Sequence, residues 1–287
     1  MRKVEMRSRI QPRRIVGWEF FNENVGVCDV VRPGGLDALS ADDRKVAEWF
    51  NEVLRGRRKV VDVGCGSGFP ALYVAPHVGE IIGVDAAPNM IVAAKENALM
   101  LGVRNARFMV GGADGLPLKD EEFDGALLCG SLESMDWPEV HRMMSEVWRG
   151  MAPGGRIVVL DQDWRDVLQR KSLSEAGVRR TKGRLIARFV QRSLSPASER
   201  DTRYLVNPES PLGRRLLAAL GDKASAPVII NPEDLDPNAV LDAWYDEAAQ
   251  FDAEALTRVL ESQGFHQIIA DTLSVWRQKM LFLAAIK

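Results

Sequence analysis

The sequence is poor in the residues that cross-link or metallate small proteins. Its 287 residues include three cysteines, Cys28, Cys65 and Cys129, and three histidines. The odd number of cysteines and the lack of a Cys-x-x-Cys pair argue against a disulfide framework and a structural zinc site. The three histidines are far apart in the chain, so a histidine-rich metal centre is not expected either. We therefore predict no bound metal.

Long hydrophobic runs are also missing. The longest apolar run is Met280–Ile286, which is far short of the roughly 20 residues of a membrane-spanning helix. The basic start, Met1-Arg2-Lys3, is not followed by the apolar segment of a signal peptide. We expect a cytoplasmic protein without a membrane partner.

The chain also lacks a large net charge of either sign. Thirty-eight Lys and Arg residues stand against 40 Asp and Glu residues, which excludes a globally basic nucleic-acid coat protein or an acidic tail protein. The balance hides a segregation of charge. Residues 1–14 carry six basic residues and one acid, and residues 165–203 carry eleven basic residues and four acids. The remainder of the chain is therefore acidic.

The sequence does contain a regular alternation of short β-branched runs and helical segments. Five runs predict strands: Val60–Val63, Ile81–Val84, Arg107–Val110, Asp124–Cys129 and Arg156–Leu160. A helix is expected from Pro88 to Leu101, and another from the cap Asp136 to Arg149, with Glu139 at the capping-box position. A helix capped by Ser40 precedes the first strand. Such alternation predicts a parallel sheet with helices on both faces.

The last part of the chain adds a helix and a hairpin. The helix Ala253–Gln263 is followed by two strands, His266–Val275 and Arg277–Ile286, which are close enough to pair as an antiparallel hairpin. Residues 163–250 contain no convincing strand except Val228–Ile230. The fold class predicted is α/β, a doubly wound, seven-stranded, mostly parallel sheet with an antiparallel C-terminal hairpin and a mainly helical insertion after strand five.

This pattern divides the chain into three parts. Residues 1–39 are expected to form an N-terminal segment or lid. Residues 40–162 and 251–287 are expected to form the main domain, and residues 163–250 a helical cap over the substrate.

The most informative stretch runs from Val61 to Pro70, where a strand leads into three glycines at alternate positions and then into a helix. Glycines let the backbone turn sharply and approach a ligand, and the helix start supplies N–H donors. The spacing is G-x-G-x-G, because Phe69 stands where a dinucleotide fingerprint needs its third glycine. Asp85, at the end of the second strand, could hold both hydroxyls of a ribose or cap the next helix. A generic strand-to-helix turn is the alternative interpretation of the glycines.

These residues resemble the class I S-adenosylmethionine-dependent methyltransferases, including their small-molecule, type 11-like members. The resemblance covers residues 59–161 and 252–287, about half of the chain. It rests on five segments in order: Val60–Gly68, Gly83–Met90, Gly111–Leu118, Phe123–Glu133 and Met151–Gly155. The resemblance implies S-adenosylmethionine as cofactor, S-adenosylhomocysteine as product, and a Rossmann-like fold that ends in an antiparallel hairpin.

The resemblance also implies which residues contact the cofactor. They are Asp62, Gly64, Cys65, Gly66, Gly68, Asp85, Ala86, Met90, Gly112, Ala113, Asp114, Cys129 and Ser131. The family usually has an acid where this chain has Gly112. Either Asp114 or the backbone at Gly112 and Ala113 would then supply the contact on the adenine side.

A catalytic residue is less certain to exist, because a sulfonium methyl group is already activated and mainly requires a well-placed nucleophile. Glu133 is the candidate base or substrate contact; a capping or surface acid is the alternative. A substrate pocket is expected from aromatic residues at the two ends of the insertion and near the N-terminus: Trp18, Phe21, Trp164, Trp244 and Tyr245. Core packing is the alternative role of each.

Three functions follow from this interpretation. The favoured one is methyl transfer to a small organic molecule. An RNA or protein methyltransferase would use the basic insertion, but this stretch has few of the aromatic residues that bind nucleic acid. The third is a non-catalytic S-adenosylmethionine-binding subunit. The sequence does not predict the oligomeric state.

Overall fold

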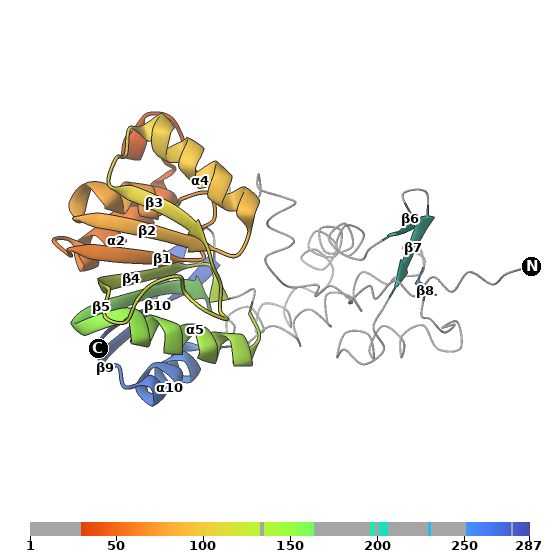
Figure 1. The fold of residues 1–287 in the computed structure, drawn as a ribbon. Helices are drawn as coiled ribbons and strands as arrows, with labels where there is room; N and C mark the ends of the chain where they lie inside the picture. Colours follow the sequence, from red (N-terminus) through yellow and green to blue (C-terminus); the bar gives the residue numbers. More distant parts are fainter. Residues whose placement is uncertain are drawn as a thin grey trace, which may run out of the picture. The chain divides into compact units, whose positions relative to one another are not determined.

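The computed structural model describes residues 30–132, 135–163, 251–276 and 278–287, of Gln278 the backbone alone, and the backbone of three short strands between residues 196 and 230 (Figure 1). The chain divides into two units. One comprises Met1–Val16 and Ser174–Glu247, and the other comprises Gly17–Leu173 and Ala248–Lys287. The larger unit contains most of the described residues.

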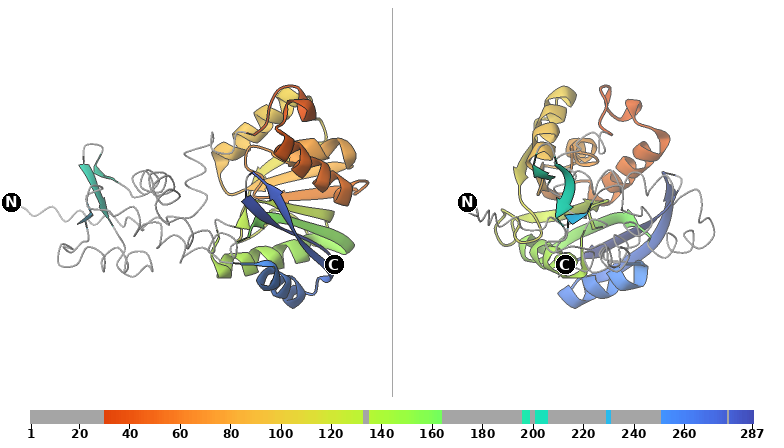
Figure 2. Two further views of the ribbon diagram at one scale, coloured as in Figure 1. Left: turned by 180° about the vertical axis from the view of Figure 1, so that it is seen from behind. Right: turned by 90° about the vertical axis from the view of Figure 1, so that its right-hand side faces the viewer.

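The larger unit is built on a seven-stranded sheet with the order β3-β2-β1-β4-β5-β10-β9. The first five strands along the chain are parallel: β1 (Lys59–Val63), β2 (Glu80–Asp85), β3 (Ala106–Val110), β4 (Phe123–Cys129) and β5 (Met151–Gln162). β10 (Gln278–Ile286) pairs antiparallel with β5, and β9 (His266–Val275) pairs antiparallel with β10 at one border of the sheet (Figure 2). The predicted α/β fold class, with its seven-stranded, mostly parallel sheet and antiparallel C-terminal hairpin, is confirmed.

The helices of this unit begin where the sequence places their caps. They are α2 (Ala41–Leu54), α3 (Ala71–Val74), α4 (Pro88–Leu101), α5 (Trp137–Gly150) and α10 (Ala253–Gln263), with the 3-10 turns η2 (Gly35–Ala38) and η3 (Ala75–His77). Ser40 caps α2 by accepting from the Asp43 N–H, and Asp136 forms the predicted capping box with Glu139 at the start of α5. None of the helices in the described ranges is long and apolar enough to cross a membrane.

Both faces of the sheet are buried. Val60, Leu127 and Val158 are fully buried in one cluster with side chains of α2. The next residues along these strands, Val61, Leu128 and Val159, point to the opposite face and are also fully buried. This double burial explains why these strands are continuous apolar runs in the sequence.

The segment just before α2 belongs to the same core. Val31 and Leu39 are 3% and 7% exposed and pack in a cluster with Leu72 and Tyr73 of α3. The backbone N–H of Arg32 donates to the Tyr73 hydroxyl. Val31 and Leu39, which belong to the segment that the sequence assigns to a lid, are therefore part of this core cluster. Residues 1–29 lie outside the described part of the chain.

A three-stranded antiparallel sheet lies within the insertion. Its strands are β6 (Pro196–Ser198), β7 (Asp201–Leu205) and β8 (Ile229–Ile230). The sequence predicts a strand only around β8. β6 and β7 were not predicted, because three to five residues of mixed polarity are too few to show a two-residue period. The rest of residues 164–250, including the expected helices, lies outside the described residues.

The hairpin that ends the chain is tied to the first turn of α2. Trp276 lies in the turn between β9 and β10. Its backbone N–H donates to Asp42 Oδ2, and its indole Nε1–H donates to Asp43 Oδ1, both at 2.7 Å. These contacts therefore join a helix near the start of the described residues to the hairpin near their end.

We expect Trp276→Phe to lower the free energy of unfolding by about 1–2 kcal/mol, because it removes the indole donor and leaves the Asp43 carboxylate without this partner. Chemical denaturation measures the loss. A double-mutant cycle with Asp43→Ala separates the contact from the other effects of each change. Strictly additive losses in that cycle would show that the hydrogen bond contributes nothing.

Candidate functional site

The loop that joins β1 to α3 turns through three glycines. Gly64, Gly66 and Gly68 have φ angles of 75°, 51° and 105°, in the left-handed region that favours glycine. A Cβ atom built on Gly64 would lie 2.5 Å from the Cβ of Ser131, so the loops after β1 and β4 touch at this point. We refer to residues Gly64–Gly68 as the glycine loop.

Asp85 connects the glycine loop to α4. It is the last residue of β2, and its Oδ2 accepts from the Gly66 N–H while its Oδ1 accepts from the Ala87 N–H, both at 2.8 Å. Burial raises the pKa of this carboxyl, and the two backbone N–H groups partly oppose that rise. Each oxygen keeps a lone pair for a further donor, such as a hydroxyl group.

Asp62 is the unusual acid of the site. It lies in β1 two residues before the glycine loop and is 1% exposed. Neither of its carboxylate oxygens has a hydrogen-bond partner among the described residues. Burial, and secondarily the charge of Asp85, raise the pKa of Asp62 well above its usual range. A buried carboxylate without a donor is costly, so a missing cationic or donating partner is the simplest explanation.

A third wall of the site follows β3. The Gly111 N–H donates to the Asp85 carbonyl at 3.0 Å, and a Cβ atom on Gly112 would lie 3.4 Å from the Cβ of Ala86. Ala113 follows in the same turn, which is closed by a bridge between Gly112 and Gly115. This wall therefore lies directly beside the end of β2.

Three of the predicted cofactor residues do not offer a free side chain to this site. Asp114 is exposed and forms an ion pair with Arg142 of α5 at 3.2 Å. Met90 is fully buried in the first turn of α4, and Cys65 is 1% exposed, with a thiol pKa raised chiefly by burial. These positions can reach a ligand through their backbone, whereas Asp62 and Asp85 present their carboxylates.

The fourth wall follows β4. Cys129 ends this strand, and the Gly130 N–H donates to the Leu160 carbonyl at 2.8 Å. Ser131 is buried against Gly64. The Leu132 N–H donates to Oδ2 of Asp161, a fully buried residue near the end of β5, at 2.8 Å. Asp161 was not among the candidate site residues, although an acid near the end of a buried strand is a visible signal in the sequence.

The site therefore joins residues from the carboxyl ends of neighbouring parallel strands. The structure brings together Asp62, the glycine loop, Asp85, Ala86, Gly112 and Ser131. The candidate base Glu133 and the five predicted pocket residues, Trp18, Phe21, Trp164, Trp244 and Tyr245, lie outside the described residues. Within the described ranges, no three His, Cys, Asp or Glu side chains gather as a metal ion would require.

Comparison with known proteins decides the family of this site. Residues 60–155 match a family model described as a methyltransferase domain. This match spans the glycine loop, Asp85, the wall after β3 and the loop after β4, and it ends within β5. Residues 60–155 therefore form a methyltransferase domain, and the chain has the fold of an S-adenosylmethionine-dependent methyltransferase. The resemblance predicted from the sequence is thereby confirmed, as is S-adenosylmethionine as the cofactor of the family.

Several curated methyltransferases share this region. YcgJ of Bacillus subtilis, an uncharacterized methyltransferase, is 36% identical over 107 residues, which are 37% of this chain and 42% of YcgJ. The arsenite methyltransferase of Halobacterium salinarum is 33% identical over 105 residues, 36% of this chain and 26% of that protein. GfsG of Streptomyces halstedii is 30% identical over 145 residues, 49% of this chain and 51% of GfsG. The chain thus spans about half or less of the length of each of these relatives.

Solved structures share the fold over a larger part of the chain. An S-adenosylmethionine-dependent methyltransferase from Aquifex aeolicus has a TM-score of 0.51 at 17% identity, covering 93% of this chain and 98% of that one. SpnF, described as a [4+2]-cyclase, has a TM-score of 0.54 at 19% identity, covering 94% of both chains. At these identities the likeness concerns the fold alone, and one fold can carry several reactions.

Proposed function

We propose that this protein transfers the methyl group of S-adenosylmethionine to a small organic acceptor and releases S-adenosylhomocysteine. The observation that carries the proposal is the orphaned, buried carboxylate of Asp62 beside the glycine loop. The names of two relatives support a small acceptor, since they specify arsenite and demethylmenaquinone. An RNA or protein acceptor, which would use the basic insertion, and a non-catalytic subunit remain the alternatives.

The residues present fit this cofactor. The free lone pairs of Asp85 suit the two ribose hydroxyls. Asp62 suits the positively charged amino group of the methionine part, because a cation would supply the missing partner of its carboxylate. A Cβ atom on Gly64 or Gly68 would lie 2.5 or 2.7 Å from a side-chain atom of Ser131 or Leu72, so the loop can follow this path only as bare glycine backbone, which a ligand can approach closely.

The bound cofactor would supply an activated methyl group on a positively charged sulfur. Transfer would require an acceptor lone pair in line with the carbon–sulfur bond, whose electron pair would stay on the sulfur. The loops after β1 and β4 would hold this geometry through Gly64 and Ser131 and exclude water. A base is needed only for an acceptor that arrives protonated; Glu133 is the proposed residue for that role.

If Asp62 binds the cofactor's amino group, replacing it should raise the stability of the unliganded protein and lower its affinity for the cofactor. We expect Asp62→Asn to stabilise the unliganded protein by about 1 kcal/mol, a rise in melting temperature of roughly 2–4 °C, because it removes an unpartnered buried charge. We expect the same change to weaken S-adenosylhomocysteine binding about tenfold, because the charge-assisted contact to the amino group is lost. Thermal unfolding and calorimetry measure the two effects.

The pH dependence of this stabilisation has a fixed sign. Because the pKa of Asp62 is raised in the fold, the unfolded chain loses this proton at lower pH than the folded chain does. The unliganded protein therefore loses stability as the pH rises from about 3.9, the ordinary pKa of Asp, through the raised pKa in the fold. The stability gain of Asp62→Asn should accordingly increase with pH.

Asp161→Asn is the matched control for this change. Asp161 is equally buried, but its carboxylate accepts from the Leu132 and Gln162 N–H groups, both at 2.8 Å. The same substitution there should lower the melting temperature, because one acceptor becomes a donor facing a donor. A lower melting temperature for Asp62→Asn at every pH would contradict the proposed missing partner.

Transfer of an isotope label tests the proposed function. The protein is incubated with methyl-labelled S-adenosylmethionine and separately with the small-molecule, RNA and protein fractions of a cell extract. Label in the small-molecule fraction supports the proposal. Label in RNA or protein supports the alternative acceptors, and binding without transfer to any fraction supports a non-catalytic subunit.

A further inference from the structure

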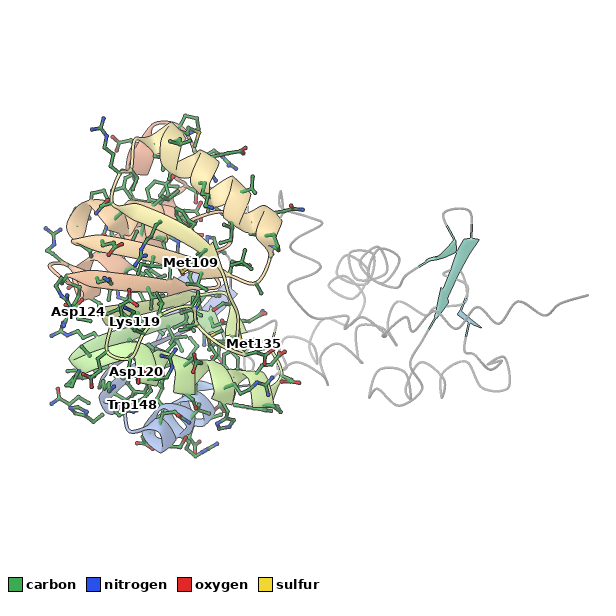
Figure 3. The ribbon with its side chains drawn as sticks, in the orientation of Figure 1. Met109, Lys119, Asp120, Asp124, Met135 and Trp148 are labelled. Carbon is green, nitrogen blue, oxygen red and sulfur yellow. The ribbon has the colours of Figure 1, made fainter. Side chains whose placement is uncertain are left out.

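The connection between β3 and β4 is held by side chains of α5. Residues 111–122 cross from one strand to the other without a helix, and they contain the wall beside Asp85 described above. Lys119 and Asp120 of this linker are labelled in Figure 3, and Asp120 pairs with Arg149 of α5 at 2.7 Å. We call residues 111–122 the β3–β4 linker.

Three charged residues of α5 contact the linker along its length. Arg142, Glu146 and Arg149 are spaced at i, i+4 and i+7, so they form a row on one side of the helix. Arg142 pairs with Asp114 at 3.2 Å, at the exposed end of the row. Glu146 Oε2 accepts from the Leu116 N–H at 2.9 Å.

Arg149 makes the densest set of contacts in this row. Its guanidinium donates to the Leu116 and Leu118 carbonyls at 3.3 and 3.0 Å and to Asp120 Oδ1 at 2.7 Å. It also binds both carboxylate oxygens of Glu146, at 3.0 and 2.8 Å. This pairing lowers the pKa of Glu146 and, together with Asp120, raises the pKa of Arg149. Both groups are therefore charged throughout the neutral pH range.

The part of the linker that α5 holds is directly connected to the wall beside Asp85. The Gly115 N–H donates to the Gly112 carbonyl at 3.1 Å, which closes the turn directly before Leu116. Gly111 lies so close to the Pro117 ring that an added Cβ atom would be 2.6 Å from its Cδ. Fixing Leu116 and Leu118 therefore fixes Gly111 and Gly112 as well.

The strand order places this wall next to the cofactor's base. The glycine loop follows β1, Asp85 ends β2, and the linker follows β3; these strands are neighbours in the order β3-β2-β1. If Asp85 holds the ribose, the group beyond the ribose lies at the end of β3. We propose that Arg149 and Glu146 are positioning residues that hold the β3–β4 linker against this base and thereby set the preference for adenine. The inference rests on the proposed cofactor binding.

The test compares two ligands that differ only in the base, S-adenosylhomocysteine and S-inosylhomocysteine, by calorimetry on the full chain. We expect Arg149→Met to weaken S-adenosylhomocysteine binding about tenfold and to reduce its advantage over the inosine compound. Arg149→Lys should behave similarly, because an ammonium group cannot reach two carbonyls and two carboxylates together. Glu146→Gln, a milder change that keeps an acceptor for the Leu116 N–H, should shift the ratio in the same direction.

Arg258→Met is the matched control, since Arg258 pairs with Glu254 on the exposed side of α10 at 2.6 Å, away from the linker. It should leave both affinities unchanged. An equal loss for the two ligands in the Arg149 and Glu146 variants would indicate a merely structural role and overturn the inference, as would unchanged affinities. A wild-type protein that binds neither ligand would instead refute the proposed cofactor site itself.

Discussion

Asp85→Ala is expected to abolish measurable binding of S-adenosylhomocysteine while the protein stays folded. The change removes both proposed ribose contacts, and hydrogen bonds to a charged group are worth about 1.5–3 kcal/mol each. It also frees the Gly66 N–H and so releases the glycine loop from the start of α4. We expect an affinity loss of at least roughly a hundredfold, measured by calorimetry.

Asp124→Ala is a close control for this experiment. Asp124 also accepts from two backbone N–H groups, those of Arg58 and Lys59, at 3.0 and 2.8 Å. It lies near the start of β4 (Figure 3), whereas Asp85 is the last residue of β2, so the two acids are at opposite ends of parallel strands. Asp124→Ala should lower the free energy of unfolding and leave the affinity for S-adenosylhomocysteine unchanged. If Asp85→Ala kept an affinity within about threefold of the wild type, the ribose assignment would be wrong.

Gly64→Val is expected to prevent cofactor binding by a different route. The Cβ atom would lie 2.5 Å from the Cβ of Ser131, and the residue would keep a φ of 75°, which a β-branched side chain adopts only under strain. The loops after β1 and β4 must therefore separate. We expect no detectable S-adenosylhomocysteine binding and a fall in melting temperature of several degrees, seen by calorimetry and thermal unfolding.

Gly102→Val distinguishes the effect of backbone strain from that of the close contact with Ser131. Gly102 ends α4 with a φ of 67°, and no atom lies within 4 Å of its added Cβ position. This variant has similar backbone strain without the contact to Ser131, so it should lose stability and retain binding. Equal binding losses in the two variants would attribute the effect of Gly64→Val to general destabilisation.

Much of the fold could be predicted because its signals are local. The apolar runs of β1 and β5, the capping box of Asp136 and Glu139, and the close spacing of β9 and β10 each depend on a few adjacent residues. Apolar strands interrupted by glycine at their carboxyl ends already indicate where loops gather in a parallel sheet. The positions of Asp62 and Asp85 near these ends made them candidates before any contact was known.

Contacts between distant segments could not be predicted in the same way. That Asp114 pairs with Arg142, and that Asp161 accepts from Leu132, depends on the path of loops whose sequences show no period. The row of charged residues on α5 could not be recognised from the sequence either, because its partners are mostly backbone groups of the β3–β4 linker. β6 and β7 are too short to produce a pattern at all.

Calorimetric titration of the 287-residue chain with S-adenosylmethionine tests the central claim, that this site binds the cofactor, most directly. We expect binding at one site with a dissociation constant below about 1 mM, and loss of that binding in Asp85→Ala. Absence of binding by the folded wild-type protein at millimolar S-adenosylmethionine would contradict it.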